Sequence, residues 1–187
     1  MPDAGAAGTP GPSAARPRAR RRRAFWVVLA VLVVLLVVDL RTLVVPAVDD
    51  PRPADAIVVY AGPGDRITRA WQLADRGLAP FVVVSIADTR ACEPERPTVT
   101  QLCFTPDPAT TQGEAEHVAR LAKRRGWDSL IIVSGTTQVT RIRLRQGRCF
   151  DGRVDVVAVR EPLGEFIFRW IYEHGAIVKA LVLQRDC

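Results

Sequence analysis

The pattern best suited to chemistry is an apolar run that leads into a small polar loop and then into a helix. Residues 129–133 are typical of a strand buried on both faces of a parallel sheet. Residues 134–137 form the loop, and Gln138 and Arg141 begin the expected helix. Backbone N–H groups and the dipole at such a helix start favour an anion, and an arginine can bind one through two N–H groups. We therefore expect Ser134, Thr137, Gln138 and Arg141 to contact an anionic ligand. The alternative for Ser134 and Thr137 is structural, because their hydroxyls can instead satisfy the turn.

A second loop with similar properties spans residues 62–66. Gly62 and Gly64 give a flexible backbone, and Asp65 and Arg66 stand where the next helix begins. Such a loop can bind a phosphate through backbone N–H groups and a cation. The alternative is structural, because Asp65 can simply cap the helix.

A third candidate pair is Thr111 and Glu114, spaced as in the capping box S/T-x-x-E. Either they cap the helix that begins there, or they belong to the ligand site at the same edge of the sheet.

Other catalytic and metal-binding patterns are missing from the sequence. His117 and His174 fall within predicted helices, where packing or solvent exposure is the commoner role. The sequence has no His, Cys, Asp or Glu cluster with metal-ligand spacing, so we expect neither a metal nor another cofactor. A G-x-S-x-G nucleophile motif is also absent, and the catalytic residue, if there is one, is unknown.

The elements that must position these residues alternate between strand and helix. Apolar runs predict strands over 56–60, 81–85, 129–133 and 154–159. Helical periodicity follows each strand. The stretch 139–146 also alternates as an edge strand would, but its place between parallel strands favours a helix. Six residues predict the buried face of a long last helix: Leu163, Phe166, Trp170, His174, Ile177 and Leu181. This order predicts an α/β fold, a Rossmann-like three-layer sandwich with a mostly parallel sheet. Its ligand site should lie at the carboxyl ends of the strands, where the strand order reverses between the first and third predicted strands.

The N-terminal part of the chain predicts one transmembrane helix. Residues 1–23 are rich in Ala, Gly, Pro and Arg and are expected to be a disordered basic tail. Residues 24–45 are long enough to span a bilayer as a helix, at about 33 Å. Residues 46–53 are expected to be a linker, and 54–187 the folded domain. A cleaved signal peptide is the alternative, because the uncharged run 24–38 is near the upper length of a signal core.

The charge distribution gives the orientation and excludes nucleic acid as a partner. Residues 1–23 hold six arginines and one aspartate, a net +5, so the other 164 residues carry only +1 of the total +6. A nucleic-acid-binding domain carries its basic excess on the fold. Arginines before the apolar run instead keep the N-terminus in the cytoplasm, which predicts a single-pass protein of the cytoplasmic membrane with its domain outside.

The four cysteines suit an exported domain with two disulfides. Cys92 and Cys103 lie in a long connection at the carboxyl edge of the predicted sheet, whereas Cys149 and Cys187 lie at the opposite edge. The topology therefore predicts the pairs Cys92–Cys103 and Cys149–Cys187. Four unpaired thiols are the alternative.

Several blocks together resemble the YdcF/SanA/ElyC family, a domain of largely unknown function. They are ADAIVVYAGPGDR, RAWQLADRGLAPFVVVS, TTQGEA, SLIIVSGTTQVTR, RCF and WIYEHGAIVKAL, and they cover about residues 54–183. The resemblance implies a Rossmann-like fold. Its SanA-like and ElyC-like members are membrane-anchored and linked to envelope integrity and peptidoglycan precursors, and YdcF itself is associated with S-adenosylmethionine.

The chain departs from the family pattern at two places. Gln138 stands where the family usually has a histidine, while Arg141 matches, and glutamine cannot carry a proton. At the Thr-x-Glu-Asn element, Glu114 is present, but Ala115 replaces the asparagine and Thr111 lies one position early.

Three functions follow as hypotheses. The first is binding or processing of a phosphorylated envelope precursor at the membrane, a class that includes lipid-linked precursors. The second is a non-catalytic interaction module of the envelope, with protein partners unknown, which Gln138 favours. The third is an S-adenosylmethionine- or nucleotide-binding enzyme, which the predicted location outside the cytoplasm disfavours.

Overall fold

The computed structural model describes residues 16–88, 92 and 97–187 of the chain. It divides into two units, one ending at Val38 and the other beginning at Asp39, and each is described here by itself. The connection predicted over residues 86–108 lies partly outside the described residues.

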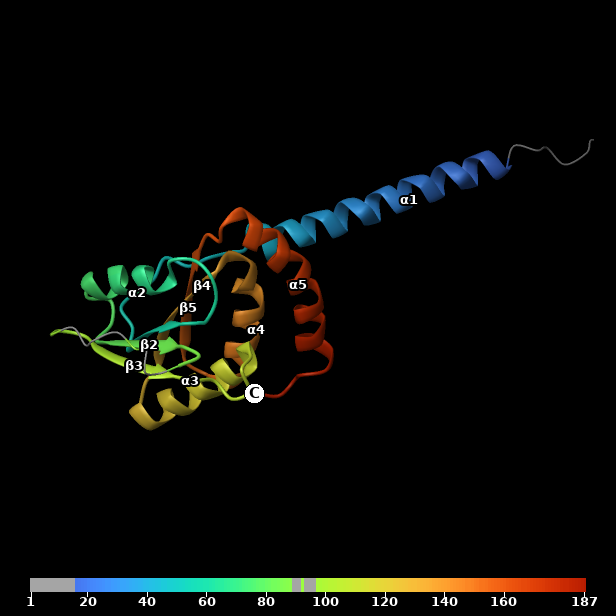
Figure 1. Cartoon of the computed structure of the whole chain (residues 1–187). Helices are drawn as coiled ribbons and strands as arrows, with labels where there is room; N and C mark the ends of the chain where they lie inside the picture. Colours follow the sequence, from blue (N-terminus) through green and yellow to red (C-terminus); the bar gives the residue numbers. More distant parts are fainter. Residues whose placement is uncertain (1–15, 89–91, 93–96) are drawn as a thin grey trace, which may run out of the picture. The chain divides into compact units, whose positions relative to one another are not determined.

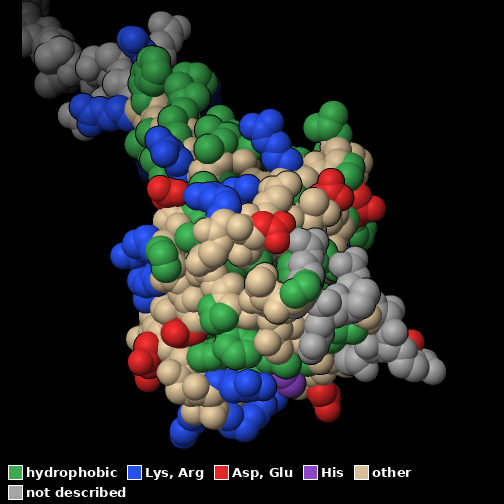
Figure 2. All heavy atoms as spheres, turned by 90° about the vertical axis from the view of Figure 1, so that its left-hand side faces the viewer, with side chains coloured by type: hydrophobic (Ala, Val, Ile, Leu, Met, Phe, Trp, Pro, Cys, Tyr) green, Lys and Arg blue, Asp and Glu red, His purple; other side chains and the backbone are tan. Residues whose placement is uncertain are grey.

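The described part of the first unit is the helix α1 (Arg16–Asp39) up to Val38. The last residue of α1 and the turn of π-helix that follows it, η1 (Leu40–Val44), belong to the second unit. Among the described residues, one helical run, Arg20–Val44, is long and apolar enough to cross a membrane. Figure 2 shows hydrophobic side chains gathered along it. Part of the tail predicted to be disordered is helical instead, since α1 begins at Arg16. Arginine has a high helix propensity and extends the apolar helix backwards.

The second unit is an α/β domain built on a parallel sheet. Its described strands are β1 (Ala56–Val59), β2 (Phe81–Ser85), β3 (Thr100–Phe104), β4 (Ser129–Gly135) and β5 (Arg153–Val159), in the order β3-β2-β1-β4-β5. All pairs are parallel, with Val58 of β1 opposite Val83 on one side and Ile132 on the other. The strand order reverses between β1 and β4, which confirms the predicted position of the switch point.

Helices cover both faces of this sheet, which confirms the predicted sandwich (Figure 1). The helix α2 (Arg66–Asp75) packs on one face through Ala70 and Trp71. On the other face lie α3 (Thr111–Arg125) and α4 (Val139–Cys149), which contribute Val118 and Ile142 to the core. A short 3-10 turn, η3 (Thr136–Gln138), joins β4 to α4. The last helix, α5 (Leu163–Val182), lies against α4 and η3, outside the sheet layers (Figure 1).

The sequence did not predict β3, whose residues were assigned to a long loop. Its segment TQLCF is short and mixes polar with apolar side chains, and it pairs only with β2 at the edge of the sheet. An edge strand buries less apolar surface than a central one, so its hydrophobic pattern is weaker.

The predicted buried face of α5 was only partly right. Phe166, Trp170 and Ile177 are half-buried, but Leu163 and Leu181 are exposed. The fully buried residues of α5 are instead Glu173 and Ala180. The helix turns a partly polar face inward because it packs on a polar region of the domain.

Residues 46–53, which were expected to form a linker, are bound to the domain. Asp49 exchanges hydrogen bonds with the backbone of Val156, through its own backbone N–H (3.0 Å) and through its carboxylate (2.7 Å). Arg52 forms an ion pair with the buried carboxylate of Asp155 at 2.9 Å. The chain after the apolar helix is therefore fixed along β5.

Both predicted disulfides are present, Cys92–Cys103 and Cys149–Cys187. The first closes a loop of 11 residues at the edge of the sheet, where Cys103 lies in β3 rather than in a loop. The second joins the end of α4 to the C-terminal residue across 38 residues.

Removing the second disulfide should destabilise the protein more than removing the first. Loop-closure entropy predicts losses of about 4 kcal/mol for the pair Cys149→Ser and Cys187→Ser and about 3 kcal/mol for Cys92→Ser and Cys103→Ser. Urea unfolding of the two double variants, followed by circular dichroism, measures the difference. Equal or reversed losses would contradict the entropic explanation.

Candidate functional site

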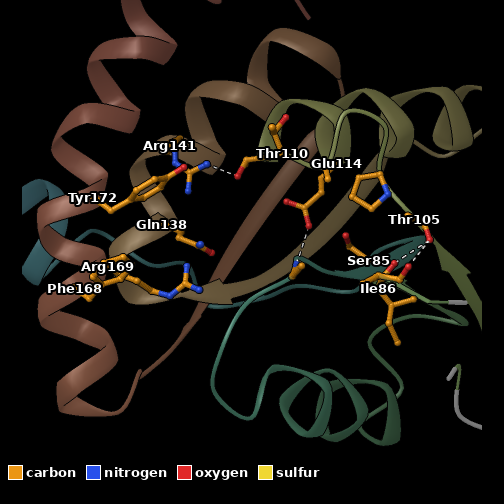
Figure 3. A pocket seen from close by; sticks show the side chains of 15 residues that line it. Ser85, Ile86, Thr105, Thr110, Glu114, Gln138, Arg141, Phe168, Arg169 and Tyr172 are labelled. Carbon is orange, nitrogen blue, oxygen red and sulfur yellow. Dashed lines mark hydrogen bonds between the residues drawn. The ribbon is translucent and has the colours of Figure 1, made fainter.

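A cavity of about 590 Å³ opens at the carboxyl edge of the sheet, between strand ends, α3, α4 and α5. Its polar lining includes Ser85, Thr105, Thr110, Thr111, Glu114, Gln138, Arg141 and Arg169, and its apolar lining includes Ile86, Pro106, Phe168 and Tyr172. Figure 3 shows that these side chains come from opposite sides and face a common space. The volume falls within the range of small-molecule sites.

Arg169 is the cation of the cavity that lacks a partner. It extends from α5 toward the space that Gln138 also faces (Figure 3). Its Nε is buried without a hydrogen-bond partner, and no ion pair with a carboxylate is present among the described residues. A buried donor with no acceptor costs free energy unless a ligand or water satisfies it. Arg169 is therefore suited to bind an anion.

Arg141 has a partner inside the protein. Its guanidinium makes a two-bond ion pair with Glu173 of α5, at 2.7 Å from Nε and 2.6 Å from Nη2. The Glu173 side chain is completely buried, and Nη1 of Arg141 donates to the hydroxyl of Thr111. The hydrogen bond and charge of Glu173 raise the pKa of Arg141 against the opposing effect of burial, which is the largest single influence. Only the Nη1 edge of Arg141 is left for the cavity.

Gln138 connects the cavity to the interior. Its Oε1 accepts a hydrogen bond from Nη1 of Arg66 at 2.9 Å. This contact fixes the amide orientation, so that the Nε2 donor is the end left for a ligand.

Glu114 is the carboxylate among the cavity-lining residues. It accepts a hydrogen bond from the backbone N–H of Ala61 at 2.8 Å. Burial raises its pKa, and this effect outweighs Ser85, the Ala61 N–H, Arg141 and Arg66, which all lower it. The Ser85 hydroxyl lies close enough to affect this pKa but forms no hydrogen bond in the structure. A carboxyl group with a raised pKa beside an unpaired hydroxyl is suited to exchange a proton with a ligand.

In the loop after β4, where an anion site was predicted, Thr137 binds a carboxylate of the protein itself. Thr137 donates to Glu161 from its hydroxyl at 3.0 Å and from its backbone N–H at 3.4 Å. Ser134 belongs to β4 and donates to the carbonyl of Gly135. A Cβ at Gly135 would overlap the Glu161 carboxylate, which explains the glycine at this position.

The loop predicted to bind phosphate encloses a cation instead. Arg66 is buried and donates to the carbonyls of Tyr60 (3.1 Å), Ala61 (2.8 Å) and Pro63 (3.0 Å). Gly62 has a φ of +146°, and a Cβ there would come within 2.6 Å of the guanidinium. Burial lowers the pKa of Arg66 to about 10, although Glu161, at 3.7 Å, opposes this effect.

The structure thus brings together four of the ten predicted ligand residues: Thr111, Glu114, Gln138 and Arg141. The other six do not line the cavity: Gly62, Gly64, Asp65, Arg66, Ser134 and Thr137. The capping box was wrong, because the N-cap of α3 is Thr110, whose hydroxyl accepts from the Gly113 N–H. Thr111 and Glu114 are consequently free to face the cavity.

The contribution of α5 to the cavity lining was not predicted from the sequence. Arg169, Phe168 and Tyr172 all line the cavity. A signal was present in the sequence, since Arg169 and Glu173 lie one helical turn apart in the middle of a helix whose other charged residues, Glu165 and Lys179, lie in its first and last turns. Residues four apart share a face of a helix, so this pair marks one face as polar.

The histidines lie outside the cavity lining. His117 stacks on Phe104 with 4.0 Å between ring centroids, and burial lowers its pKa. His174 contacts Asp39. In the described ranges of the chain, no three His, Cys, Asp or Glu side chains are grouped to hold a metal ion.

Comparisons of the chain with family models, curated proteins and solved structures give no match.

Removing the Arg66 guanidinium should destabilise the fold. Arg66→Met leaves Glu161 buried without its cation and three carbonyls without a donor, with an expected loss of about 3–5 kcal/mol. Arg76→Met, at an exposed position after α2, is the matched control and should change stability by less than about 0.5 kcal/mol. Urea unfolding measures both. Equal losses would show that Arg66 is not a structural centre.

The raised pKa of Glu114 predicts how stability depends on pH. The folded protein favours the protonated acid, so Glu114 lowers stability as the pH rises through its raised pKa. Glu114→Gln removes this pH-dependent loss of stability and keeps a side-chain oxygen that can accept from the backbone N–H of Ala61. The stability of the variant relative to wild type should therefore increase from acidic to neutral pH, as measured by thermal unfolding. Glu116→Gln on the same helix should show no comparable increase, and a constant difference for Glu114→Gln would contradict the assignment.

Proposed function

We propose that this protein is a membrane-anchored domain outside the cytoplasm that binds a phosphorylated cell-envelope precursor in the cavity at the carboxyl edge of its sheet. The observation that carries this proposal is Arg169, whose buried Nε has no hydrogen-bond partner and whose guanidinium faces the cavity. A phosphate group satisfies such a cation through two charge-assisted hydrogen bonds.

The remaining lining defines the class of ligand. The amide of Gln138, the Nη1 edge of Arg141 and the hydroxyls of Ser85 and Thr110 can donate to phosphate or sugar oxygens. Ile86, Phe168 and Tyr172 add an apolar side to the same cavity. A phosphate or diphosphate with an attached sugar or lipid offers oxygens to the donors of the lining and a less polar part to its apolar side.

The location is supported by two features. Arginines precede the apolar helix Arg20–Val44, and positive charge is retained on the cytoplasmic side. The domain beyond it carries two disulfides, which persist in an oxidising compartment. The proposal also includes that the domain is a member of the YdcF/SanA/ElyC family, which its sequence resembles.

Processing of the ligand would depend on Glu114. The family histidine is replaced by Gln138, whose side chain accepts from Arg66 and cannot transfer a proton. Glu114 has a raised pKa and lies in the same cavity, so it is the group suited to take a proton from a ligand hydroxyl or a water. A non-catalytic envelope module is the second candidate, favoured by this fixed role of Gln138, and turnover of a phosphoester or glycosyl substrate that is lost in Glu114→Gln would exclude it.

Arg169→Gln should weaken ligand binding without unfolding the protein. Loss of a charge-assisted contact of about 1.5–3 kcal/mol corresponds to roughly a 10- to 100-fold loss of affinity. The measurement is a thermal-shift panel on the full chain in detergent, with pyrophosphate, a nucleotide-sugar, a polyprenyl-phosphate analogue and S-adenosylmethionine. The matched control is Arg124→Gln, which removes an equal charge from the exposed end of α3.

Each outcome of the panel has a direct meaning. Stabilisation by a phosphorylated compound that is retained in Arg124→Gln and reduced in Arg169→Gln supports the proposal. Stabilisation by none of the four compounds, or equal shifts in both variants, would overturn it. A shift with S-adenosylmethionine alone would favour the cofactor-binding enzyme instead.

A further inference from the structure

The outer face of α5 is apolar and exposed. Ile167, Phe168, Ile171 and Tyr172 are 59%, 70%, 62% and 57% exposed, and the face continues to the C-terminal end of the helix through Val178, Leu181 and Val182. The inward face of the same helix carries Arg169 and Glu173. A contiguous apolar patch of this kind marks a surface that contacts a partner or a membrane.

Hydrogen bonds join α5 to the residue that follows the apolar run. Asp39 accepts from Nε1 of Trp170 at 3.1 Å and contacts Nε2 of His174 at 2.8 Å. Asp39 is covalently attached to Val38, the last residue of the uncharged stretch that begins at Ala24. The middle of α5 is therefore hydrogen-bonded to Asp39, the residue that directly follows the uncharged stretch.

The connection from this point to the domain is short and fixed. Leu43 of η1 is buried, and the hydroxyl of Thr140 donates to the carbonyl of Thr42 at 2.5 Å. Arg143 forms an ion pair with Asp49 at 2.7 Å. These contacts fix residues 42–49 on the α/β domain.

We propose that α5 lies in the interface of the bilayer and that its outer apolar face contacts lipid. The occupant is the membrane because α5 is hydrogen-bonded to Asp39, which directly follows the uncharged stretch. In the segment after Asp39, Leu40, Val45 and Val48 are also exposed. Tryptophan and tyrosine are enriched at this depth, and Trp170 and Tyr172 belong to α5.

The inference rests on the anchor in the proposed function and adds an entrance to the cavity. Phe168 and Tyr172 belong to the exposed face of α5 and also line the cavity. Contact of this face with lipid would place the cavity rim at the bilayer surface. A ligand with a phosphate head and an apolar tail could then bind through its head without leaving the membrane.

Quenching of tryptophan by lipids brominated in their acyl chains tests this placement in the full chain, reconstituted in nanodiscs. Ile171→Trp puts a reporter at the centre of the outer face, and Gln72→Trp is the matched control on the exposed surface of α2. The part of the native quenching that is lost in Trp26→Phe reports whether the apolar run is inserted, because Trp71, Trp127 and Trp170 also contribute to the native emission. We expect brominated lipids to quench the added emission of Ile171→Trp and to leave that of Gln72→Trp unchanged.

The other outcomes separate the two proposals. Quenching at Trp26 without extra quenching in Ile171→Trp would overturn the placement of α5 but leave the anchor intact. Absence of quenching at Trp26 would overturn the anchor itself. Chemical cross-linking between two copies through α5, without lipid quenching, would assign the face to a second copy. Ile167→Trp repeats the test one turn earlier, and circular dichroism confirms that each variant is folded.

Discussion

The ion pair between Arg141 and Glu173 is the interaction on which the site depends. The Glu173 carboxylate is completely buried, and an unpaired charge there would cost several kcal/mol. Two hydrogen bonds from Arg141 compensate this charge and hold α5 against α4. Helix α5 in turn carries Arg169, Phe168 and Tyr172 into the cavity wall, and it binds Asp39 through Trp170 and His174. One buried pair thus positions the cavity wall, the apolar outer face and the attachment to the N-terminal segment.

Three arginines near the carboxyl edge of the sheet differ in which groups neutralise their positive charge. Arg66 lies among backbone carbonyls and near Glu161, and Arg141 is paired with Glu173. Both carboxylates come from the C-terminal part of the chain and fill positions that a ligand anion would otherwise occupy. Arg169 has no such carboxylate among the described residues, and its charge faces the cavity. The anionic ligand of the proposed function would therefore be held from α5 rather than by the glycine loop or the loop after β4.

The general fold could be predicted because its signals are local. The runs AIVV and FVVVS and the apolar part of SLIIVSG are buried in the central strands, and apolar runs of this kind identify such strands in a sequence. The alternation of strands and helices then predicted a parallel sheet and the position of the switch point. It also predicted the edge of the sheet at which each cysteine lies. Thr100–Phe104 was missed because an edge strand pairs on one side only and needs no continuous apolar run. The buried face of α5 was predicted only in part because periodicity identifies an apolar stripe but does not state what the stripe packs against.

For the site, residue types alone determined which kinds of chemistry were available: arginines and helix starts for an anion, a glutamate for proton transfer, and an apolar run for the membrane. The tertiary structure decided which of these groups remain available to a ligand. Glu161 and Glu173 are distant in sequence from Thr137 and Arg141, by 24 and 32 residues, and only folding brings them into contact. Sequence spacing identifies a group that can bind an anion, but it does not reveal that the protein already provides one. That distinction depends on burial and on contacts between distant segments, which only the folded chain defines.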